Sequence, residues 1–432
     1  MICNSKALPH EKLEAFFSEF LRLIFKAAPS QHAAFLTRAE QEFRRAGYRD
    51  ENSAGVQNIL VVKLDAIGDM ILTSGFLREL RKNFPRERIT LLVSPTVFPI
   101  VELCPYVNEI LIFDFKILNG TLPEWLKHIT EFCKAYLWPK MFSLAFSPRW
   151  GRGNLHALLI AWLSGARERI GYGVNSYESW LGAPLAEETA QDNFLLTKNI
   201  ITPRSVVTEA DKNFYLLEAL GLPVTETHME IFFGAEDFRR ARELLQTIPP
   251  NCKKVLIGIG GAARTKKYPV EKYLIALKEL AKKNLVFVLV GGQAELDDAD
   301  FLEKNLPHGK VLNLVGKTTL RETEAVVVQT DFYVGNDTGV VHMAATAQIP
   351  CLVLYREAQD REDYLPGVFS EYQCFPPWQT NSVILRPAHP LDDCAEMPPI
   401  CGVCRHIREP HCITQIAPQE IIDGFEVLET LG

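Results

Sequence analysis

Short apolar runs alternate with amphipathic stretches along most of this chain, and the alternation occurs in two successive series. The apolar runs lie at 58–64, 89–94, 109–114 and 143–148, and then at 255–260, 285–292, 311–316, 332–337 and 350–355. Helical patterns fit between them, at 69–83, 153–164, 270–282, 295–304, 320–328 and 339–347. Strands that alternate with helices form parallel sheets with helices on both faces. The pattern predicts two doubly wound α/β halves that face each other across a cleft.

The composition is that of an ordinary globular protein. The chain has 432 residues, of which 47% are hydrophobic and 23% are charged, and its formal net charge is −7. This balance argues against disorder and against nucleic-acid binding by bulk charge. The longest apolar runs are far shorter than the roughly 18–20 residues that span a bilayer. The N-terminus lacks the pattern of a secretory signal, so we expect a cytoplasmic protein.

The chain is expected to divide into four segments. Residues 1–54 form a helical N-terminal extension, in which Leu13, Phe16, Phe20 and Ile24 recur at helical spacing. This apolar stripe either docks on the rest of the chain or makes a homo-oligomer contact with another copy. The expected segments that follow are 55–215, the first Rossmann-like domain; 216–375, the second, with a linker-like stretch at 216–250; and 376–432, a cysteine-rich loop and C-terminal helix.

The end of the run at 332–337 is the most informative point for chemistry. Asn336, Asp337, Thr338 and Gly339 follow one another there, and an alanine-rich helical stretch begins at once. A helix N-terminus offers free N–H donors and a partial positive charge, which suit a diphosphate. Asp337 or Thr338 could equally serve only as the N-cap of that helix. No clean G-x-G-x-x-G opens any predicted helix, so a dinucleotide dehydrogenase is not supported.

Six segments of this sequence resemble those of glycosyltransferase family 9, the ADP-heptose:lipopolysaccharide heptosyltransferases. They are KLDAIGDMILTSGFLRELRKNFP (63–85), GARERIGY (165–172), GAARTKKYP (261–269), GGQAE (291–295), NDTG-x-x-H-x-A-A (336–345) and CGVC…C-I-x-x-I-x-P-x-E (401–420). They occur in the family's order. The first 54 residues lie outside the resemblance.

The resemblance implies a GT-B architecture, with an N-terminal acceptor domain and a C-terminal nucleotide-sugar domain. It also implies an inverting transfer that needs no metal or other cofactor for catalysis. By position, Asp69 matches the family's catalytic aspartate, whose role is the general base toward the acceptor hydroxyl. Without the resemblance, Asp69 could be only the N-cap of the following helix.

The resemblance also assigns residues to the donor. Lys266 matches the family's diphosphate lysine, although its neighbour Lys267 leaves the register open by one residue. Glu295 matches the acid near the donor ribose, but as a first-turn residue it could equally serve a helix N-terminus. Asp337 would hold donor-sugar hydroxyls, and Thr338 and Gly339 would receive phosphate. The sequence departs from many members at 262–263, where two alanines replace residues with hydroxyl groups.

Cysteines crowd into one stretch near the C-terminus, at Cys394, Cys401, Cys404 and Cys412. The C-x2-C core has a spacing that suits a structural zinc or iron ion, and the same stretch could also be a loop of reduced thiols. Some autotransporter heptosyltransferases of the family carry iron on a cysteine cluster. Basic residues also gather on the expected acceptor half, where they predict a surface for an anionic acceptor: Arg78, Arg81, Lys82, Arg149, Arg152, Arg167 and Arg169.

Three functions fit these features. The first is transfer of heptose from ADP-heptose to a lipopolysaccharide core, carried out in the cytoplasm or at the inner face of the inner membrane as a peripheral protein. The second is transfer of heptose to a protein acceptor such as an autotransporter. The third belongs to another class: a catalytically inactive GT-B protein that binds a nucleotide or a partner. The retained Asp69, Lys266 and Asp337 argue against this third function, and the alanines at 262–263 argue mildly for it.

Overall fold

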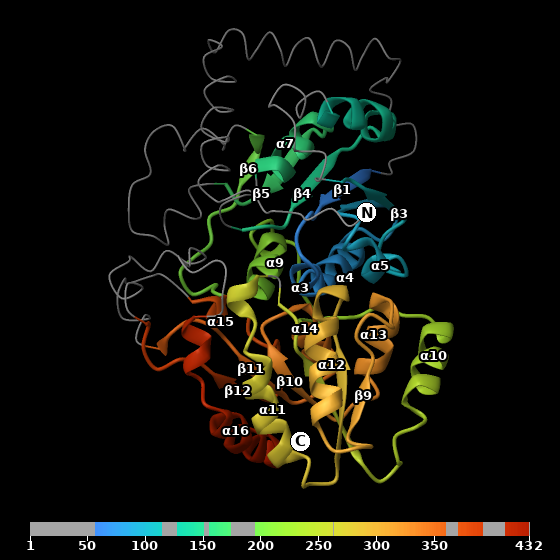
Figure 1. The fold of residues 1–432 in the computed structure, drawn as a ribbon. Helices are drawn as coiled ribbons and strands as arrows, with labels where there is room; N and C mark the ends of the chain where they lie inside the picture. The colour runs from blue at the N-terminus through green and yellow to red at the C-terminus, as the bar shows by residue number, and fades with distance from the viewer. Residues whose placement is uncertain are drawn as a thin grey trace.

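The computed structural model describes residues 57–114, 128–150, 155–173, 195–261, 263–359, 370–391 and 411–431. They form two six-stranded sheets, and every strand pairing within each sheet is parallel. Helices lie on the faces of both sheets, as expected for two Rossmann-like domains (Figure 1). The predicted extension at 1–54 lies outside the described residues. Within these ranges no helix has the length and apolar character needed to cross a bilayer.

The first sheet has the strand order β3-β2-β1-β4-β5-β6. Its strands are β1 (Asn58–Val62), β2 (Arg88–Val93), β3 (Glu109–Ile112), β4 (Leu144–Ser147), β5 (Glu168–Gly171) and β6 (Lys198–Asn199). The helices of this half are α3 (Ile67–Ile71), α4 (Ser74–Asn83), α5 (Phe98–Val101), α7 (Leu155–Leu163) and α9 (Glu209–Glu218), with η2 (Cys133–Leu137) and η3 (Trp138–Lys140) before β4. After Asn58 the central strand β1 is entirely apolar and buried, as expected for a strand whose sheet is covered by helices on both faces.

The second sheet has the order β12-β11-β10-β7-β8-β9. Its strands are β7 (Lys253–Gly258), β8 (Leu285–Val290), β9 (Val311–Asn313), β10 (Phe332–Asn336), β11 (Cys351–Leu354) and β12 (Ser382–Leu385). Its longer helices are α10 (Ala235–Leu245), α11 (Val270–Leu280), α12 (Leu296–Asn305), α13 (Leu320–Val327), α14 (Gly339–Thr346) and α16 (Pro418–Leu431). The shorter ones are α15 (Glu371–Cys374), η5 (Arg264–Lys266), η6 (Gln293–Glu295) and η9 (Cys412–Gln415). The sheet extends past residue 375, because β12 pairs with β11.

The helix expected at 69–83 is in fact two helices, α3 and α4, separated at Leu72 and Thr73. At the break, a side chain from a distant helix supplies a hydrogen bond to the backbone: Nδ2 of Asn213 on α9 donates to the Leu72 carbonyl oxygen at 2.9 Å. The Thr73 hydroxyl donates to the Asp69 carbonyl oxygen at 2.7 Å. The break ends α3 one turn after Asp69, so the turn that carries this residue is separate from the longer helix α4.

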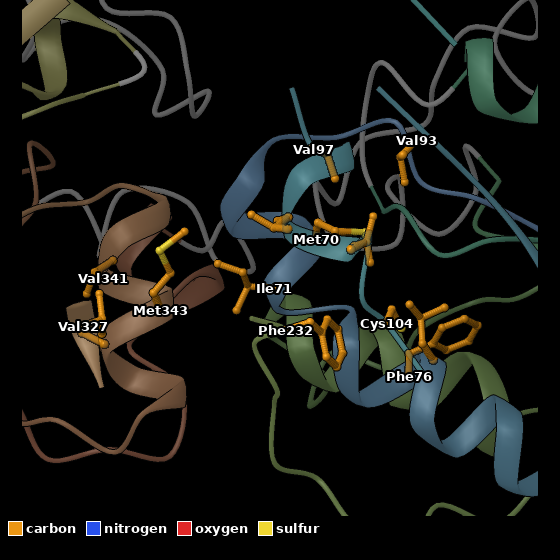
Figure 2. Packing of buried hydrophobic residues seen from close by; sticks show 14 of the residues in the cluster. Met70, Ile71, Phe76, Val93, Val97, Cys104, Phe232, Val327, Val341 and Met343 are labelled. Carbon is orange, nitrogen blue, oxygen red and sulfur yellow. The ribbon is translucent and has the colours of Figure 1, made fainter. Parts of the chain in front are cut away.

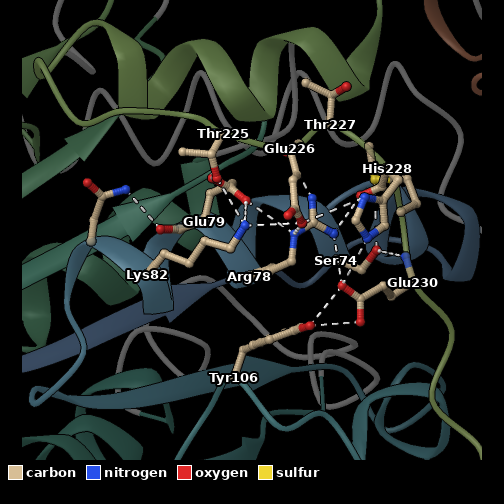
Figure 3. Close-up of polar contacts among 12 residues, drawn as sticks. Ser74, Arg78, Glu79, Lys82, Tyr106, Thr225, Glu226, Thr227, His228 and Glu230 are labelled. Carbon is tan, nitrogen blue, oxygen red and sulfur yellow. Dashed lines mark hydrogen bonds and ion pairs between the residues drawn. The ribbon is translucent and has the colours of Figure 1, made fainter.

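Residues 219–234, between α9 and α10, form the interdomain segment. A dense set of polar contacts binds this segment along α4 (Figure 3). The buried guanidinium of Arg78 donates to the carbonyl oxygens of Glu226 and His228 and to the Glu230 carboxylate, each at 2.8 Å. Glu79 accepts the backbone N–H of Thr225 at 2.7 Å. These contacts fasten the interdomain segment to the first domain before it enters α10.

Most of the basic residues predicted to form a surface for an anionic acceptor make contacts within the fold, and their role toward an acceptor stays a prediction. Arg78 and Lys82 bind the interdomain segment, Arg81 donates to the carbonyl oxygens of Phe84 and Tyr106, Arg149 pairs with Asp65, and Arg169 donates to the carbonyl oxygens of Ala166 and Leu195. Arg152 lies outside the described residues. A guanidinium bound to backbone carbonyls inside the fold has few donors left for a ligand.

One apolar cluster joins the two domains. Ile71 of α3 lies toward Met343 of α14, with Met70, Val341 and Val327 close by (Figure 2). All five side chains are buried and belong to the same cluster. The side of the interdomain boundary formed by α3 and α14 is therefore packed with apolar side chains.

Candidate active site

Two chain turns meet where α3 of the first domain approaches α14 of the second (Figure 1). A β-carbon on Gly68 would lie 2.6 Å from Cδ2 of His342, and one on Gly339 would lie 2.7 Å from Cγ2 of Ile67. Both distances are shorter than real side-chain contacts, so glycine allows each backbone to approach the other domain. The turn that precedes Asp69 therefore lies directly against the turn that follows Asp337. These turns lie at the carboxyl ends of β1 and β10, the usual ligand-binding edge of such sheets.

Asp69 is half-buried in the first turn of α3, and its carboxylate accepts the backbone N–H of Ala66 at 3.2 Å. The alternative prediction, that Asp69 is the N-cap of the helix, is wrong: Ala66 is the N-cap of α3, and Asp69 lies at the third helical position and bonds back to it. Burial raises the pKa of the Asp69 carboxyl to about 6, although the positive charges of Lys63 and Lys266 oppose the shift. A carboxylate with this pKa is mostly ionised near neutral pH and yet binds a proton more readily than an ordinary aspartate. This is the property required of a general base.

Lys63 is a fully buried cation at the end of β1, beneath the same turn. Its ammonium group lies 2.9 Å from Oε1 of Glu209 and 3.0 Å from Oδ2 of Asp65, and it donates to the Pro148 carbonyl oxygen at 2.7 Å. Asp65 also pairs with Arg149. A buried charge is retained only when it is paired in this way. Sequence reasoning did not single out Lys63, because one lysine after an apolar strand carries no distinctive pattern.

The two neighbouring lysines of the loop after β7 point to different carboxylates, which distinguishes them. Lys266 lies 2.7 Å from Oδ2 of Asp337 and 3.3 Å from Oε2 of Glu371. Lys267 instead pairs with Glu295. Although burial opposes the shift, Asp337 and Glu371 raise the pKa of Lys266 above its usual value. Lys266 therefore stays charged and lies beside Asp337, the residue that precedes the α14 turn.

Glu295 lies in the short helix η6, which follows β8. Its carboxylate accepts the Gly292 N–H at 2.9 Å, and a β-carbon on Gly260 would lie 3.4 Å from the carboxylate carbon. Both alternatives for this residue remain compatible with this placement, because it serves the helix N-terminus and also lies where the ends of β7 and β8 meet. Glu295 is buried, and Lys267 supplies the compensating charge.

The first turn of α14 is capped by a side chain. The Thr338 side chain accepts the Val340 N–H at 3.3 Å, so Thr338 is the N-cap of α14. His342 is buried one turn further on; burial lowers its pKa to about 4, so its ring is neutral, and Nδ1 has no hydrogen-bond partner within the described ranges. Asn336 was not predicted as a site residue. It donates to the Gly260 carbonyl oxygen at 2.8 Å and accepts the Tyr268 N–H at 3.2 Å, which ties β10 to the lysine loop.

Three of the four cysteines predicted to bind a metal, Cys394, Cys401 and Cys404, lie outside the described residues. Cys412 is described, half-buried at the start of η9, with its sulfur 3.4 Å from Nδ1 of His411. Among the described residues, no three histidine, cysteine or acidic side chains group as metal ligands would. The cluster stays a prediction that elemental analysis for zinc and iron would test.

Comparison with known proteins agrees with this fold. The model of the family described as glycosyltransferase family 9 (heptosyltransferase) matches residues 155–389, which is more than half of the chain. The chain is 20% identical over 302 residues to lipopolysaccharide core heptosyltransferase OpsX of Haemophilus influenzae, covering 69% of this chain and 79% of that protein. It is 23% identical over 334 residues to lipopolysaccharide heptosyltransferase 3 of Escherichia coli, covering 75% and 89%.

Solved structures give the same architecture. A family 9 glycosyltransferase of Veillonella parvula superposes with a TM-score of 0.66 at 18% identity, covering 87% of this chain and 98% of that one. The Escherichia coli heptosyltransferase WaaC with ADP gives a TM-score of 0.59 at 15% identity, covering 86% and 100%. Two parallel α/β domains that share a site at their facing sheet edges define the GT-B class of glycosyltransferases. Within that class the chain belongs to glycosyltransferase family 9, and it is a glycosyltransferase enzyme.

Proposed function

We propose that this enzyme transfers heptose from ADP-heptose to an acceptor hydroxyl of the lipopolysaccharide core. The observation that carries the proposal is the contact of α3 with α14 through Gly68 and Gly339. That contact brings the turn of Asp69 against the turn of Asp337, which in turn pairs with Lys266. This arrangement supports a single site in which Asp69 is the base toward the acceptor and Lys266 the cation for the departing diphosphate. The relatives named as lipopolysaccharide heptosyltransferases supply the choice of sugar and acceptor.

The proposed reaction is a single displacement with inversion. The acceptor oxygen attacks the anomeric carbon of the heptose while the bond from that carbon to the β-phosphate oxygen of ADP breaks. Asp69 takes the proton from the attacking hydroxyl, for which its raised pKa suits it. Lys266 stabilises the negative charge that builds on the leaving diphosphate.

The remaining donor contacts follow the same geometry. Asp337 would accept hydrogen bonds from heptose hydroxyls, and the backbone N–H groups at Thr338 and Gly339 would receive phosphate at the N-terminus of α14. Glu295 would accept hydrogen bonds from the ribose. Because Asp337 pairs with Lys266, we propose that the donor diphosphate competes with Asp337 for the lysine.

A screen of nucleotide sugars by thermal shift tests the donor, since a ligand that binds only the folded state raises the melting temperature. ADP-heptose is expected to give the largest shift, with GDP- and UDP-sugars close to zero. Transfer is then measured with purified lipopolysaccharide core and with an autotransporter polypeptide as competing acceptors. Incorporation into the polypeptide alone would favour the protein O-heptosyltransferase function, and donor binding without transfer to either would favour an inactive binding protein.

A further inference from the structure

Lys266 is held by more than its bond to Asp337. The second carboxylate beside it belongs to Glu371, the first residue of the short helix α15, and the two Glu371 oxygens have different partners. Oε2 lies 3.3 Å from the Lys266 ammonium group, whereas Oε1 accepts a hydrogen bond from Arg356 at 2.8 Å. One carboxylate therefore bridges the lysine and an arginine that follows β11.

Arg356 completes a closed ring of contacts. Its other terminal nitrogen donates to the Thr265 hydroxyl at 2.7 Å, and Thr265 is the residue immediately before Lys266 in η5. The lysine is thus fixed at its ammonium group by Glu371 and through its backbone by Thr265, with Arg356 joining the two. All these side chains are largely buried, and a fully satisfied buried polar network restrains its members to one arrangement.

The positive charges of the ring keep the Glu371 carboxylate ionised. Although burial opposes the shift, Lys266 and Arg356 lower the pKa of Glu371. Glu371 is therefore a carboxylate near neutral pH and keeps both of its ion pairs. If a donor diphosphate displaces Asp337 from Lys266, Glu371 remains as the lysine's second carboxylate partner and can hold it in place during that exchange.

We propose that Glu371 and Arg356 are positioning residues that fix the Lys266 ammonium group for the donor diphosphate. This inference rests on the proposed donor-binding role of Lys266. Neither Glu371 nor Arg356 needs to contact the substrate.

The sign of one substitution separates positioning from simple electrostatics. Glu371→Gln removes a negative charge beside the diphosphate lysine, so electrostatics alone predicts that ADP binds more tightly. If Glu371 positions the lysine, ADP binds about tenfold more weakly, which is within the coupling range of contacting residues. Calorimetric titration of the full-length protein with ADP measures the difference. Tighter or unchanged binding by Glu371→Gln would overturn the proposal.

Adding Glu371→Gln to the Lys266→Ala variant shows whether Glu371 affects ADP binding through Lys266. A positioning residue for Lys266 has nothing to position there, so adding Glu371→Gln should not weaken ADP binding further. An additional tenfold loss would contradict the proposal, since it would mean that Glu371 acts on the ligand or the fold directly. Arg356→Met and Thr265→Val are expected to weaken binding each by a few-fold, with the double variant no weaker than the worse single one.

A matched control uses an acid–lysine pair at the other end of the same domain. Glu429 on α16 pairs with Lys283, which precedes β8 and so lies at the edge of the sheet opposite the site. Glu429→Gln makes the same change of charge and should leave ADP affinity unchanged. If the wild-type protein itself binds no ADP, the proposed donor fails; if it binds ADP and Glu371→Gln binds equally well, only the positioning role fails.

Discussion

The two domains surround their charged groups at the candidate site, Asp69 and Lys266, in different ways. On the first domain, Asp69 has one long hydrogen bond to a backbone N–H, and burial raises its pKa. On the second domain, Lys266 is enclosed by Asp337 and Glu371, and these carboxylates raise its pKa further above neutrality. The first arrangement keeps a group ready to take a proton, whereas the second keeps a cation permanently charged. The difference matches what a base and a diphosphate-binding group each require.

The largest effect is expected at the base. Asp69→Asn keeps the size of the side chain and removes the group that takes the proton, so the transfer rate should fall by about 10²–10⁴-fold. The measurement is the rate of heptose transfer at saturating donor and acceptor. Retention of near-normal transfer by this variant would remove Asp69 from the mechanism.

Substitution of a glycine can disrupt the contact between α3 and α14. Gly339→Ala places a β-carbon 2.7 Å from Cγ2 of Ile67, so the α3 turn must move away. We expect transfer to fall by about 10-fold or more because small displacements of reacting groups are costly. The matched control is Gly234→Ala, whose β-carbon meets its nearest neighbours at an ordinary 3.5 Å. Equal activities of the two variants would show that the close approach of α3 and α14 is unimportant for transfer.

The pH dependence of the reaction sharpens the comparison. Asp69 must be ionised to accept a proton, and its pKa is about 6, so kcat/KM should rise with pH through about 6 and level off above 7. Below the inflection the rate should fall about tenfold per pH unit. Lys266 stays charged over this range and adds no inflection. A profile that is flat between pH 5 and 7 would contradict the assignment of Asp69.

A smaller effect concerns stability at the boundary between the domains rather than catalysis. Glu324 on α13 is fully buried, and burial raises the pKa of its carboxyl to about 8. The native state keeps this proton over a range in which the unfolded chain, with an ordinary glutamate pKa, has lost it. Stability from this group therefore falls as pH rises from about 4.5 to about 8, by up to about 1.4 kcal/mol per unit.

Glu324→Gln removes this titration while keeping the shape of the side chain. The variant should match the wild type in free energy of unfolding near pH 4.5 and exceed it by about 2–4 kcal/mol at pH 8. Urea denaturation at the two pH values measures the difference. A constant difference between the proteins at both pH values would argue against a buried, protonated Glu324.

The central strands could be predicted from the sequence to within a few residues, because strands buried on both faces are apolar along their length. β12 was missed because it is short and only partly buried. The bounds of α9 and α10 were not predicted, because polar residues interrupt the periodicity in that region. The break between α3 and α4 depends on Asn213, which is 141 residues away from Leu72. Local patterns carry no information on such a contact.

The candidate site, like the fold, could be predicted from the sequence only in part. The turns that hold Asp69 and Asp337 follow predicted strands, so their position at one edge of each sheet was foreseeable. The separate partners of Lys266 and Lys267 were not, because two adjacent lysines look alike in sequence. Glu371 and Arg356 belong to no motif, and only the folded chain brings them to the lysine.

The proposed base and the proposed donor-binding cation lie on different domains, and one titration tests this division directly. Asp69→Asn and Lys266→Ala are titrated with ADP alongside the wild-type protein. We predict that Asp69→Asn binds ADP within about twofold of the wild type, whereas Lys266→Ala loses about 10–100-fold, as expected for a charge-assisted contact. The opposite pattern, with ADP affinity lost in Asp69→Asn and retained in Lys266→Ala, would contradict the account.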